Sequence, residues 1–305
     1  MTTEQLLKNL EVPVGQVDVV LDTDTYNEID DQFAAAYLLK YGEKLKVKGI
    51  CAAPVFNERS VSPEDGMVRS YQEIFKLLKL ADREDLNEVV FEGSRNYLPD
   101  ETTPVDSPAA RFMAELSNEY SPEKPLYIVA IGAITNVASA LLLNPRMKEN
   151  TVIVWLGGTA LHCSRNDEFN LLQDIAAARV VFGCGVPLVQ LPCWGVVDHF
   201  TTTEFELRHW LQGKNALCDY LLELTAGYHK VHENTAVWSK VIWDVTAVAA
   251  IVAPETLDMV QMPRPIVTDS ENYAFDSARP HYVYVRRIRR DALYTDLFQK
   301  LVNKS

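Results

Sequence analysis

The sequence predicts a single α/β domain over residues 1–305, in which a mostly parallel central sheet is flanked by helices. Short apolar runs alternate with helical patterns along most of the chain, an order typical of parallel sheets covered on both faces. The hydrophobic fraction of 48% and the charged fraction of 23% are globular values, and 305 residues suffice for such a domain. Because no repeat, linker or low-complexity stretch divides the chain, one domain is expected.

Six apolar runs have the length and composition of strands. They lie at residues 17–22, 47–55, 88–93, 126–132, 151–158 and 186–192. In parallel α/β sheets, ligands bind beyond the carboxyl ends of the strands. We therefore expect the residues at these ends to converge in space, namely residues 22–24, Asn57, residues 131–132 and residues 157–158.

Helical patterns fill the segments between these runs, and several have clear end signals. Ser62, followed by Pro63 and two acidic residues, is typical of a helix start, and Ser107 before Pro108 gives a similar signal. Gly42 stands at a C-cap position. Helices are predicted at residues 30–42, 62–80, from 107 onward, 135–144, 174–185, 204–232, 244–254 and 291–302, with two further strand-like runs before the last helix.

Charge and cysteine usage exclude several classes of function. The net charge of −13 makes nucleic acid and anionic membranes poor partners, and we interpret the basic run VRRIRRD (285–291) as the exposed face of a late strand. The five cysteines are odd in number and form no CxxC pair, which argues against a disulfide framework or a zinc site. Neither a signal peptide nor a transmembrane run is found, so a cytoplasmic location is expected.

The segment DTDTYNEIDD, residues 22–31, is the most informative one in the chain. It contains four aspartates and one glutamate between an apolar strand and an apolar helix. Asp30 and Asp31 could cap that helix, whose first turn favours carboxylates. The remaining acids would still repel one another, which raises their pKa values or requires a cation. Carboxylate oxygens favour Ca²⁺ or Mg²⁺ over zinc.

Two later segments also contain residues suited to ligand binding. In NDEFN (166–170), Glu168 and Asn170 would face the same way if the stretch were extended, and a carboxylate beside an amide suits a sugar. A polar loop is the alternative. In IWDVTAVAAIV (242–252), Trp243 and Asp244 stand at the mouth of an apolar helix, where an N-cap role for Asp244 and simple packing for Trp243 remain open.

Together these segments resemble the nucleoside hydrolase family of the inosine-uridine preferring type, as a divergent member. DTDTYNEIDD is similar to the family's DxDPGxDD, with two extra residues and without the Pro-Gly. VAIGAITNVASALLLNP, WLGG, EFNLLQDIAAARVVFGCGVPLV and WDVTAVAAIVAPE match further family motifs in order, so the resemblance spans about residues 17–302. It implies a nucleoside hydrolase-like fold, a homodimer or homotetramer, and Ca²⁺-dependent hydrolysis of the N-glycosidic bond of ribonucleosides, a reaction of purine salvage.

The resemblance also implies roles for individual residues. Asp24 would bind Ca²⁺ and accept a proton from the attacking water, and Asp22 would support the site. The implied Ca²⁺ ligands are Asp24, Asp31, Asp244 and the backbone carbonyl of Ile131. The implied substrate contacts are Asp30, Asn57, Glu168, Asn170, Trp243 and Asp244.

Three departures from the family pattern affect the site. The acidic loop is two residues longer, so Tyr26, Asn27 and Glu28 are candidates to intrude on the pocket. The loop between residues 158 and 168 is shorter, which leaves His162 and Asn166 as candidates for an asparagine that the family has there. Trp243 stands where the inosine-uridine branch has a histidine, a leaving-group acid, and where the purine-preferring branch has a tryptophan that stacks on the base. Purine nucleosides are therefore slightly favoured.

Two other functions remain open. VVLDTD resembles the DxD motif of haloacid-dehalogenase-type phosphatases, in which Asp22 would be the nucleophile and Mg²⁺ the metal, but neither EFN nor WD is then explained. The second is a riboside-binding pseudoenzyme on the hydrolase fold, suggested by the altered loop and the missing histidine. Retention of Asp24, Asp31 and Asp244 argues against it, because loss of the metal would be the simplest route to inactivity.

Overall fold

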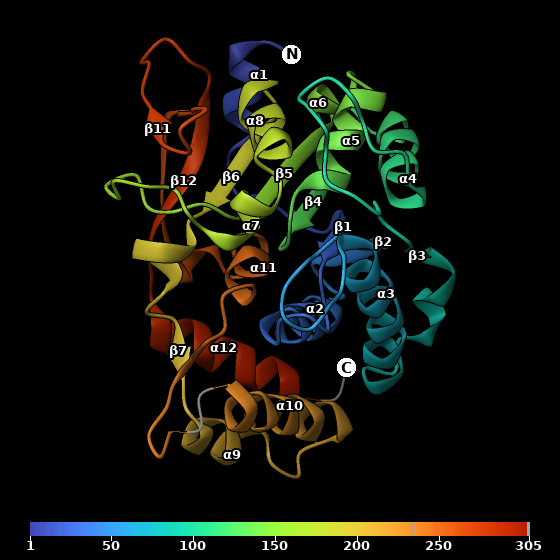
Figure 1. Ribbon diagram of the computed structural model, residues 1–305, viewed down its shortest axis with the longest axis vertical. Helices are drawn as coiled ribbons and strands as arrows, with labels where there is room; N and C mark the ends of the chain where they lie inside the picture. Colours follow the sequence, from blue (N-terminus) through green and yellow to red (C-terminus); the bar gives the residue numbers. More distant parts are fainter. Residues whose placement is uncertain (233–234, 304–305) are drawn as a thin grey trace.

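An eight-stranded sheet runs through the protein (Figure 1), and the computed structural model describes residues 1–232 and 235–303. The strand order is β3-β2-β1-β4-β5-β6-β12-β9, and every neighbouring pair is parallel except β12 and β9. The mostly parallel sheet predicted from the sequence is thus confirmed. Its strands are β1 (Val17–Thr23), β2 (Leu45–Ala52), β3 (Val90–Phe91), β4 (Leu126–Ala130), β5 (Thr151–Leu156), β6 (Leu188–Leu191), β9 (Leu257–Pro263) and β12 (His281–Ile288).

Helices flank this sheet in two groups. In one group α4 and α8 pack against α5, and in the other α11 and α12 pack against α2; the strands run between the groups in Figure 1. The helices are α1 (Thr3–Asn9), α2 (Asp30–Lys40), α3 (Pro63–Leu80), α4 (Pro108–Leu116), α5 (Thr135–Leu143), α6 (Met147–Asn150), α7 (Phe169–Gln173), α8 (Ile175–Gly183), α9 (Glu204–Leu211), α10 (Ala216–His232), α11 (Val245–Val252) and α12 (Arg290–Val302). No helix among the described residues is long and apolar enough to cross a membrane.

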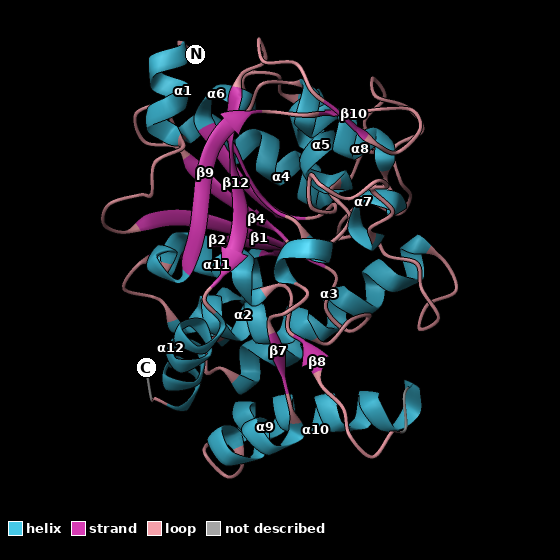
Figure 2. Ribbon diagram, turned by 90° about the vertical axis from the view of Figure 1, so that its left-hand side faces the viewer, coloured by secondary structure: helices cyan, strands magenta, loops and turns pink. Residues whose placement is uncertain are grey.

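Short strands complete the fold outside the main sheet. Figure 2 shows β9 alongside β12 and the small strands β7 and β8 near α9 and α10. The pairs are β7 (Thr201–Thr202) with β8 (Lys240–Val241), and β10 (Ile266–Val267) with β11 (Tyr273–Ala274). Arg286 and Arg287 on β12 are exposed, so the interpretation of the basic run as an exposed strand holds for this part of it, whereas Arg290 and Asp291 begin α12.

The predicted helix starts were more accurate than the predicted ends. Ser62 accepts a hydrogen bond from the N–H of Asp65, and Ser107 accepts one from the N–H of Ala110, so both caps are confirmed. The Gly42 cap was wrong, because α2 ends at Lys40 and Gly42 does not have the left-handed φ of a glycine C-cap. The single helix expected at 204–232 is two helices, since the chain turns at residues 212–215.

The central strands form the core. All residues of β4 and β5 are buried, as expected for strands covered on both faces. Trp155 on β5 is fully buried, and its indole N–H donates to the carbonyl of Gly132, 3.1 Å away. This bond joins the loop after β4 to β5, so packing in the core fixes the backbone at the carboxyl edge of the sheet.

Asp174 connects three segments at that same edge. It caps α8 by accepting from the N–H of Ala177 at 2.9 Å, and it also accepts from the N–H of Leu98 and the hydroxyl of Thr135. The Asp174→Ala variant leaves these donors without an acceptor in the interior. We expect the free energy of unfolding to fall by about 2–4 kcal/mol in urea titrations.

The matched control is Asp167→Ala, in a neighbouring loop where the side chain is exposed. Its free energy of unfolding should change by less than about 0.5 kcal/mol. Equal urea midpoints for the two variants would show that the Asp174 network contributes little to stability.

Candidate functional site

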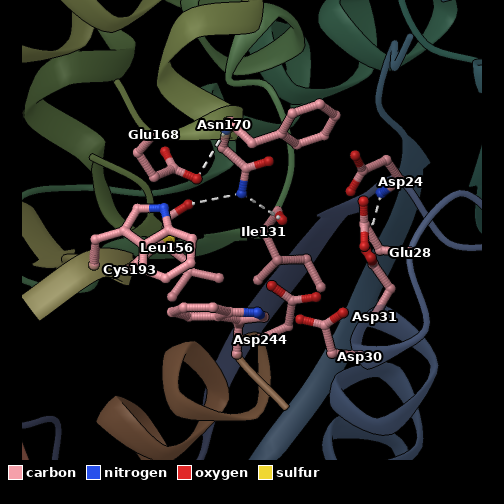
Figure 3. A pocket seen from close by; sticks show the side chains of 13 residues that line it. Asp24, Glu28, Asp30, Asp31, Ile131, Leu156, Glu168, Asn170, Cys193 and Asp244 are labelled. Atoms are coloured by element: carbon pink, nitrogen blue, oxygen red, sulfur yellow. Dashed lines mark hydrogen bonds between the residues drawn. The ribbon is translucent and has the colours of Figure 1, made fainter. Parts of the chain in front are cut away.

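The carboxyl ends of β1, β4, β5 and β6 meet at a pocket with about 520 Å³ of empty space. Asp24, Ile131 and Cys193 follow β1, β4 and β6, and Leu156 ends β5 (Figure 3). The predicted convergence of strand ends is thus observed for Asp24 and Ile131, whereas Asn57 and residues 157–158 do not line the pocket. The lining residues are Asp24, Glu28, Asp30, Asp31, Ile131, Leu156, Glu168, Phe169, Asn170, Cys193, Trp194, Trp243 and Asp244.

The acidic side of this pocket contains buried carboxylate oxygens without hydrogen-bond donors. One oxygen of Asp31 accepts from the hydroxyl of Thr23 at 2.5 Å and from the N–H of Asp24 at 3.0 Å. One oxygen each of Asp24, Asp30 and Asp31 is buried and accepts no hydrogen bond in the described structure. Oxygens of Asp30, Asp31 and Asp244 lie within 4.8 Å of one another. This donor set fits a hard cation such as Ca²⁺.

Helix capping does not account for these acids. Asp244 occupies the N-cap position of α11, but its side chain makes no capping hydrogen bond. The N-cap of α2 is Ile29, and Asp30 and Asp31 follow it in the first turn. Their carboxylates benefit from the positive end of α2, yet Asp30 and Asp31 still have oxygens turned toward the pocket without a partner.

Burial raises the pKa of every aspartate in this cluster. Burial, followed by the charge of Asp30, raises the pKa of Asp31 to about 7. Burial, followed by the charge of Asp30, raises the pKa of Glu28 to about 8. The pKa values of Asp24 and Asp244 are raised by burial and then by the surrounding carboxylates. The site therefore favours the binding of protons or of a cation.

These shifts predict an unusual pH dependence of stability when divalent metal is removed. Asp31 has a pKa near 7 when folded and 3.8 as its ordinary value, so the folded state binds more protons between these values. The free energy of unfolding should therefore fall as pH rises from about 4 to about 7. Thermal melts in chelator should show this fall, and added Ca²⁺ should reduce it, because the metal takes the place of the protons. A metal-free protein that becomes more stable over that range would contradict the prediction.

Glu168 and Asn170 both line the pocket, but not on an extended stretch. Glu168 is the N-cap of α7, and its carboxylate accepts from the N–H groups of Gly158, Asn170 and Leu171 at 2.7–2.9 Å. The Asn170 side-chain amide donates to the carbonyls of Ile131 and Leu156, each at 3.1 Å (Figure 3). A carbonyl has two lone pairs, so Ile131 retains one for a further contact.

The candidate residues of the longer acidic loop point in different directions. Glu28 reaches the pocket beside Asp24 and Asp31 (Figure 3). Tyr26 turns away with a left-handed φ of 81°, and the guanidinium of Arg59 lies 4.6 Å from its ring centroid. The insertion therefore adds one carboxylate to the pocket, held by contacts outside it.

Besides Tyr26, five residues that the sequence suggested for the site do not line the pocket. Asn27 is buried outside the pocket lining. Its side-chain amide donates to the hydroxyl of Ser70 and the carbonyl of Gly66, and its backbone carbonyl accepts from the side chain of Asn57. Asp22 is fully buried and accepts from Asn136 at 2.8 Å, a position unsuited to a phosphatase nucleophile. These five residues are Asp22, Asn27, Asn57, His162 and Asn166; His162 is exposed, and Asn166 accepts from the N–H of Thr159 at 2.7 Å.

Sequence reasoning missed four lining residues. Trp194 and Trp243 meet with ring centroids 5.2 Å apart at an interplanar angle of 68°. Cys193 and Trp194 lie just beyond Pro192 at the end of β6, so the rule about strand ends could have found them. Phe169 and Leu156 adjoin motifs that the sequence singled out, and only the path of the backbone shows that they also reach the pocket.

Comparisons with known proteins agree on one family. The family model described as "Inosine-uridine preferring nucleoside hydrolase" matches residues 19–286. A probable uridine nucleosidase of Arabidopsis thaliana is 28% identical over 144 residues, which is 46% of this chain and 44% of that protein. The match thus spans less than half of that relative.

Solved structures show the same fold. A plant nucleoside hydrolase superposes with a TM-score of 0.76 at 20% identity, over 94% of this chain and 99% of that one. A purine-preferring ribonucleoside hydrolase from Gardnerella vaginalis gives a TM-score of 0.76 at 19% identity, over 93% and 98% of the two chains.

Proposed function

Because this chain belongs to the inosine-uridine preferring nucleoside hydrolase family, we propose that it hydrolyses the N-glycosidic bond of ribonucleosides to free base and ribose. The pocket combines two kinds of surface that support this function. Buried, unpartnered oxygens of Asp24, Asp30 and Asp31 lie in the same pocket as the indole of Trp243. A sugar with a planar base attached requires these two kinds of surface side by side.

The acidic residues fit a divalent cation, for which we propose Ca²⁺. Asp24, Asp31, Asp244 and the carbonyl of Ile131 would hold it, and the proximity of Asp30 to Asp31 and Asp244 makes Asp30 a neighbour of that site. All these donors are oxygens, which suits Ca²⁺ better than zinc. A bound cation of this kind lowers the pKa of water and fixes its position.

The chain's own residues supply the rest of the chemistry. Asp24, with one oxygen free of hydrogen bonds, would take a proton from the attacking water. Asp30 and Asn170 would contact the ribose hydroxyls, and Glu168 would position Asn170 by accepting from its N–H. Positive charge develops on the sugar ring as the bond breaks, so carboxylate contacts that strengthen at that stage accelerate the reaction.

Trp243 supports a modest preference for purine nucleosides. Its indole lines the pocket, and a purine offers a larger face for stacking than a pyrimidine does. We also propose that the protein forms a homodimer or a homotetramer, because the resemblance to the family implies one of these states.

Chromatographic detection of free base tests the function. Purine and pyrimidine ribonucleosides are incubated with the protein, once with Ca²⁺ and once with chelator. Base release that depends on Ca²⁺ is the expected result, with purines somewhat faster. Binding of ribonucleosides without release of base from any of them would support the riboside-binding pseudoenzyme instead.

A further inference from the structure

Two indole rings, those of Trp194 and Trp243, form an aromatic side of the pocket. Figure 3 places Cys193 and Glu168 across the pocket from Asp24 and Glu28. Trp194, next to Cys193 in the chain, lines the pocket although 52% of its surface is exposed, and it forms a corner with Trp243. An exposed indole face of this kind attracts cations as well as flat rings.

Around Trp194, the described lining residues outside the acid cluster offer no suitable proton donor. Glu168 is occupied as an acceptor by three backbone N–H groups. The Cys193 thiol is buried, and burial and the adjacent Glu168 raise its pKa well above the usual range. His162 is exposed and lies outside the lining. A base that must leave as an anion therefore meets no acid here, although such an acid is worth roughly 10²–10⁴ in rate.

The pocket as a whole has an excess of acidic groups. Lys240 acts electrostatically on Glu28 and Asp30, but it is not part of the lining. With all six carboxyl groups ionised, one divalent cation and this lysine together would balance half of their charge, and clefts lined by one sign of charge concentrate ligands of the other sign. The six carboxyl groups that line the pocket are Asp24, Glu28, Asp30, Asp31, Glu168 and Asp244.

We propose that the preferred substrates are ribosides whose base carries a fixed positive charge on its ring, such as quaternised pyridines or N-alkylated purines. This inference rests on the proposed function. The corner formed by Trp194 and Trp243 would bind the cationic ring, and the acidic pocket would attract it.

The chemistry of such substrates suits a site without a leaving-group acid. The oxygen of water bonds to C1′ of the ribose while the bond from C1′ to the ring nitrogen breaks. The electron pair of the broken bond returns to that nitrogen and cancels its positive charge. One proton of the water passes to Asp24, and the base leaves as a neutral molecule. A neutral nucleoside would need a proton on its base at the same stage.

The first test compares kcat/KM for the riboside of pyridinium-3-carboxamide with the values for inosine, guanosine and uridine, in Ca²⁺. We expect the cationic riboside to exceed each neutral one by about 100-fold or more. Neutral purine nucleosides that react equally fast or faster would overturn this inference and leave the proposed function intact. Failure to cleave any riboside would instead contradict the proposed function.

A binding measurement gives a readout that does not depend on turnover. Quenching of tryptophan fluorescence is followed as the pyridinium riboside, or the uncharged C-riboside of benzamide, is added to the Asp24→Asn protein. The charged compound should bind roughly tenfold more tightly than its neutral isostere. Equal affinities would contradict the role given to charge.

Variants of Trp194 test whether its indole ring binds the cationic base. Trp194→Leu should lower the ratio of cationic to neutral kcat/KM about tenfold, and Trp194→Phe should retain most of it. Trp210→Leu is the matched control, because Trp210 is 42% exposed on α9 and lies outside the pocket lining. In His162→Gln, neutral purine turnover should be unchanged. A 100-fold loss there would identify His162 as a leaving-group acid and overturn the inference.

Discussion

Asp24→Asn should lower kcat by about 10²–10⁴-fold while the protein remains folded. Asparagine has the shape of aspartate, and the backbone N–H of Asp24 would still donate to Asp31. The amide has no basicity, so the attacking water would lose its proton acceptor. Steady-state assays of base release measure the rate, and circular dichroism with thermal melts checks the fold.

Asp18→Asn provides a matched control on the same strand. Asp18 lies near the opposite end of β1, where its carboxylate accepts from the hydroxyl of Tyr120 at 2.8 Å. An amide oxygen can still accept that hydrogen bond, so activity should change less than about twofold. A fully active Asp24→Asn protein would rule out Asp24 as the proton acceptor.

Asp31→Asn should abolish both Ca²⁺ binding and turnover. One oxygen of Asp31 accepts from Thr23 and Asp24, and the side-chain oxygen of asparagine can accept the same two bonds. The amide nitrogen then replaces the unpartnered oxygen and removes a ligand for the cation. In the wild type, Ca²⁺ at 100 times its Kd should raise Tm by roughly 5 °C, and in the variant this shift should vanish.

Metal-free melts distinguish loss of a ligand from loss of the fold. Asp31 is a buried acid beside other acids, so its replacement removes repulsion, and the variant in chelator should be at least as stable as the wild type in chelator. An unchanged Ca²⁺ shift in Asp31→Asn would show that Asp31 is not a ligand. A large drop in Tm in chelator would mean that Asp31 is needed for the fold itself.

Much of the fold and part of the site could be predicted from local sequence. The capping serines Ser62 and Ser107 act on backbone groups within three residues, so their effect is visible in the sequence. The acid cluster at 22–31 is also local, and its position at a strand end indicated a pocket. The single helix expected at residues 204–232 overlooked a signal that the sequence contains, because Gly213 has a left-handed φ of 70° after α9 and the side chain of Asn215 accepts from the N–H of Cys218 at the start of α10.

Other features depend on contacts between distant segments. The side chain of Asn170 binds the carbonyls of Ile131 and Leu156, which belong to the ends of two different strands. Glu168 holds the N–H of Gly158, so the residue expected to bind sugar also fixes the diglycine loop. Neither pairing leaves a mark in the sequence, because hydrogen bonds between residues 10 to 39 positions apart follow no periodic pattern.

By itself, the sequence determined the order of strands and helices, the family, and the carboxylates around which the site is built. These properties follow from periodicity, capping and motif spacing, which act over a few residues. The tertiary structure alone decided which side chains reach the pocket: Glu28 and Trp194 line it, whereas Asn57 and His162 do not. The physical reason is that parallel strands bring their carboxyl ends together, while the direction of each loop beyond those ends is set by packing and hydrogen bonds with remote segments.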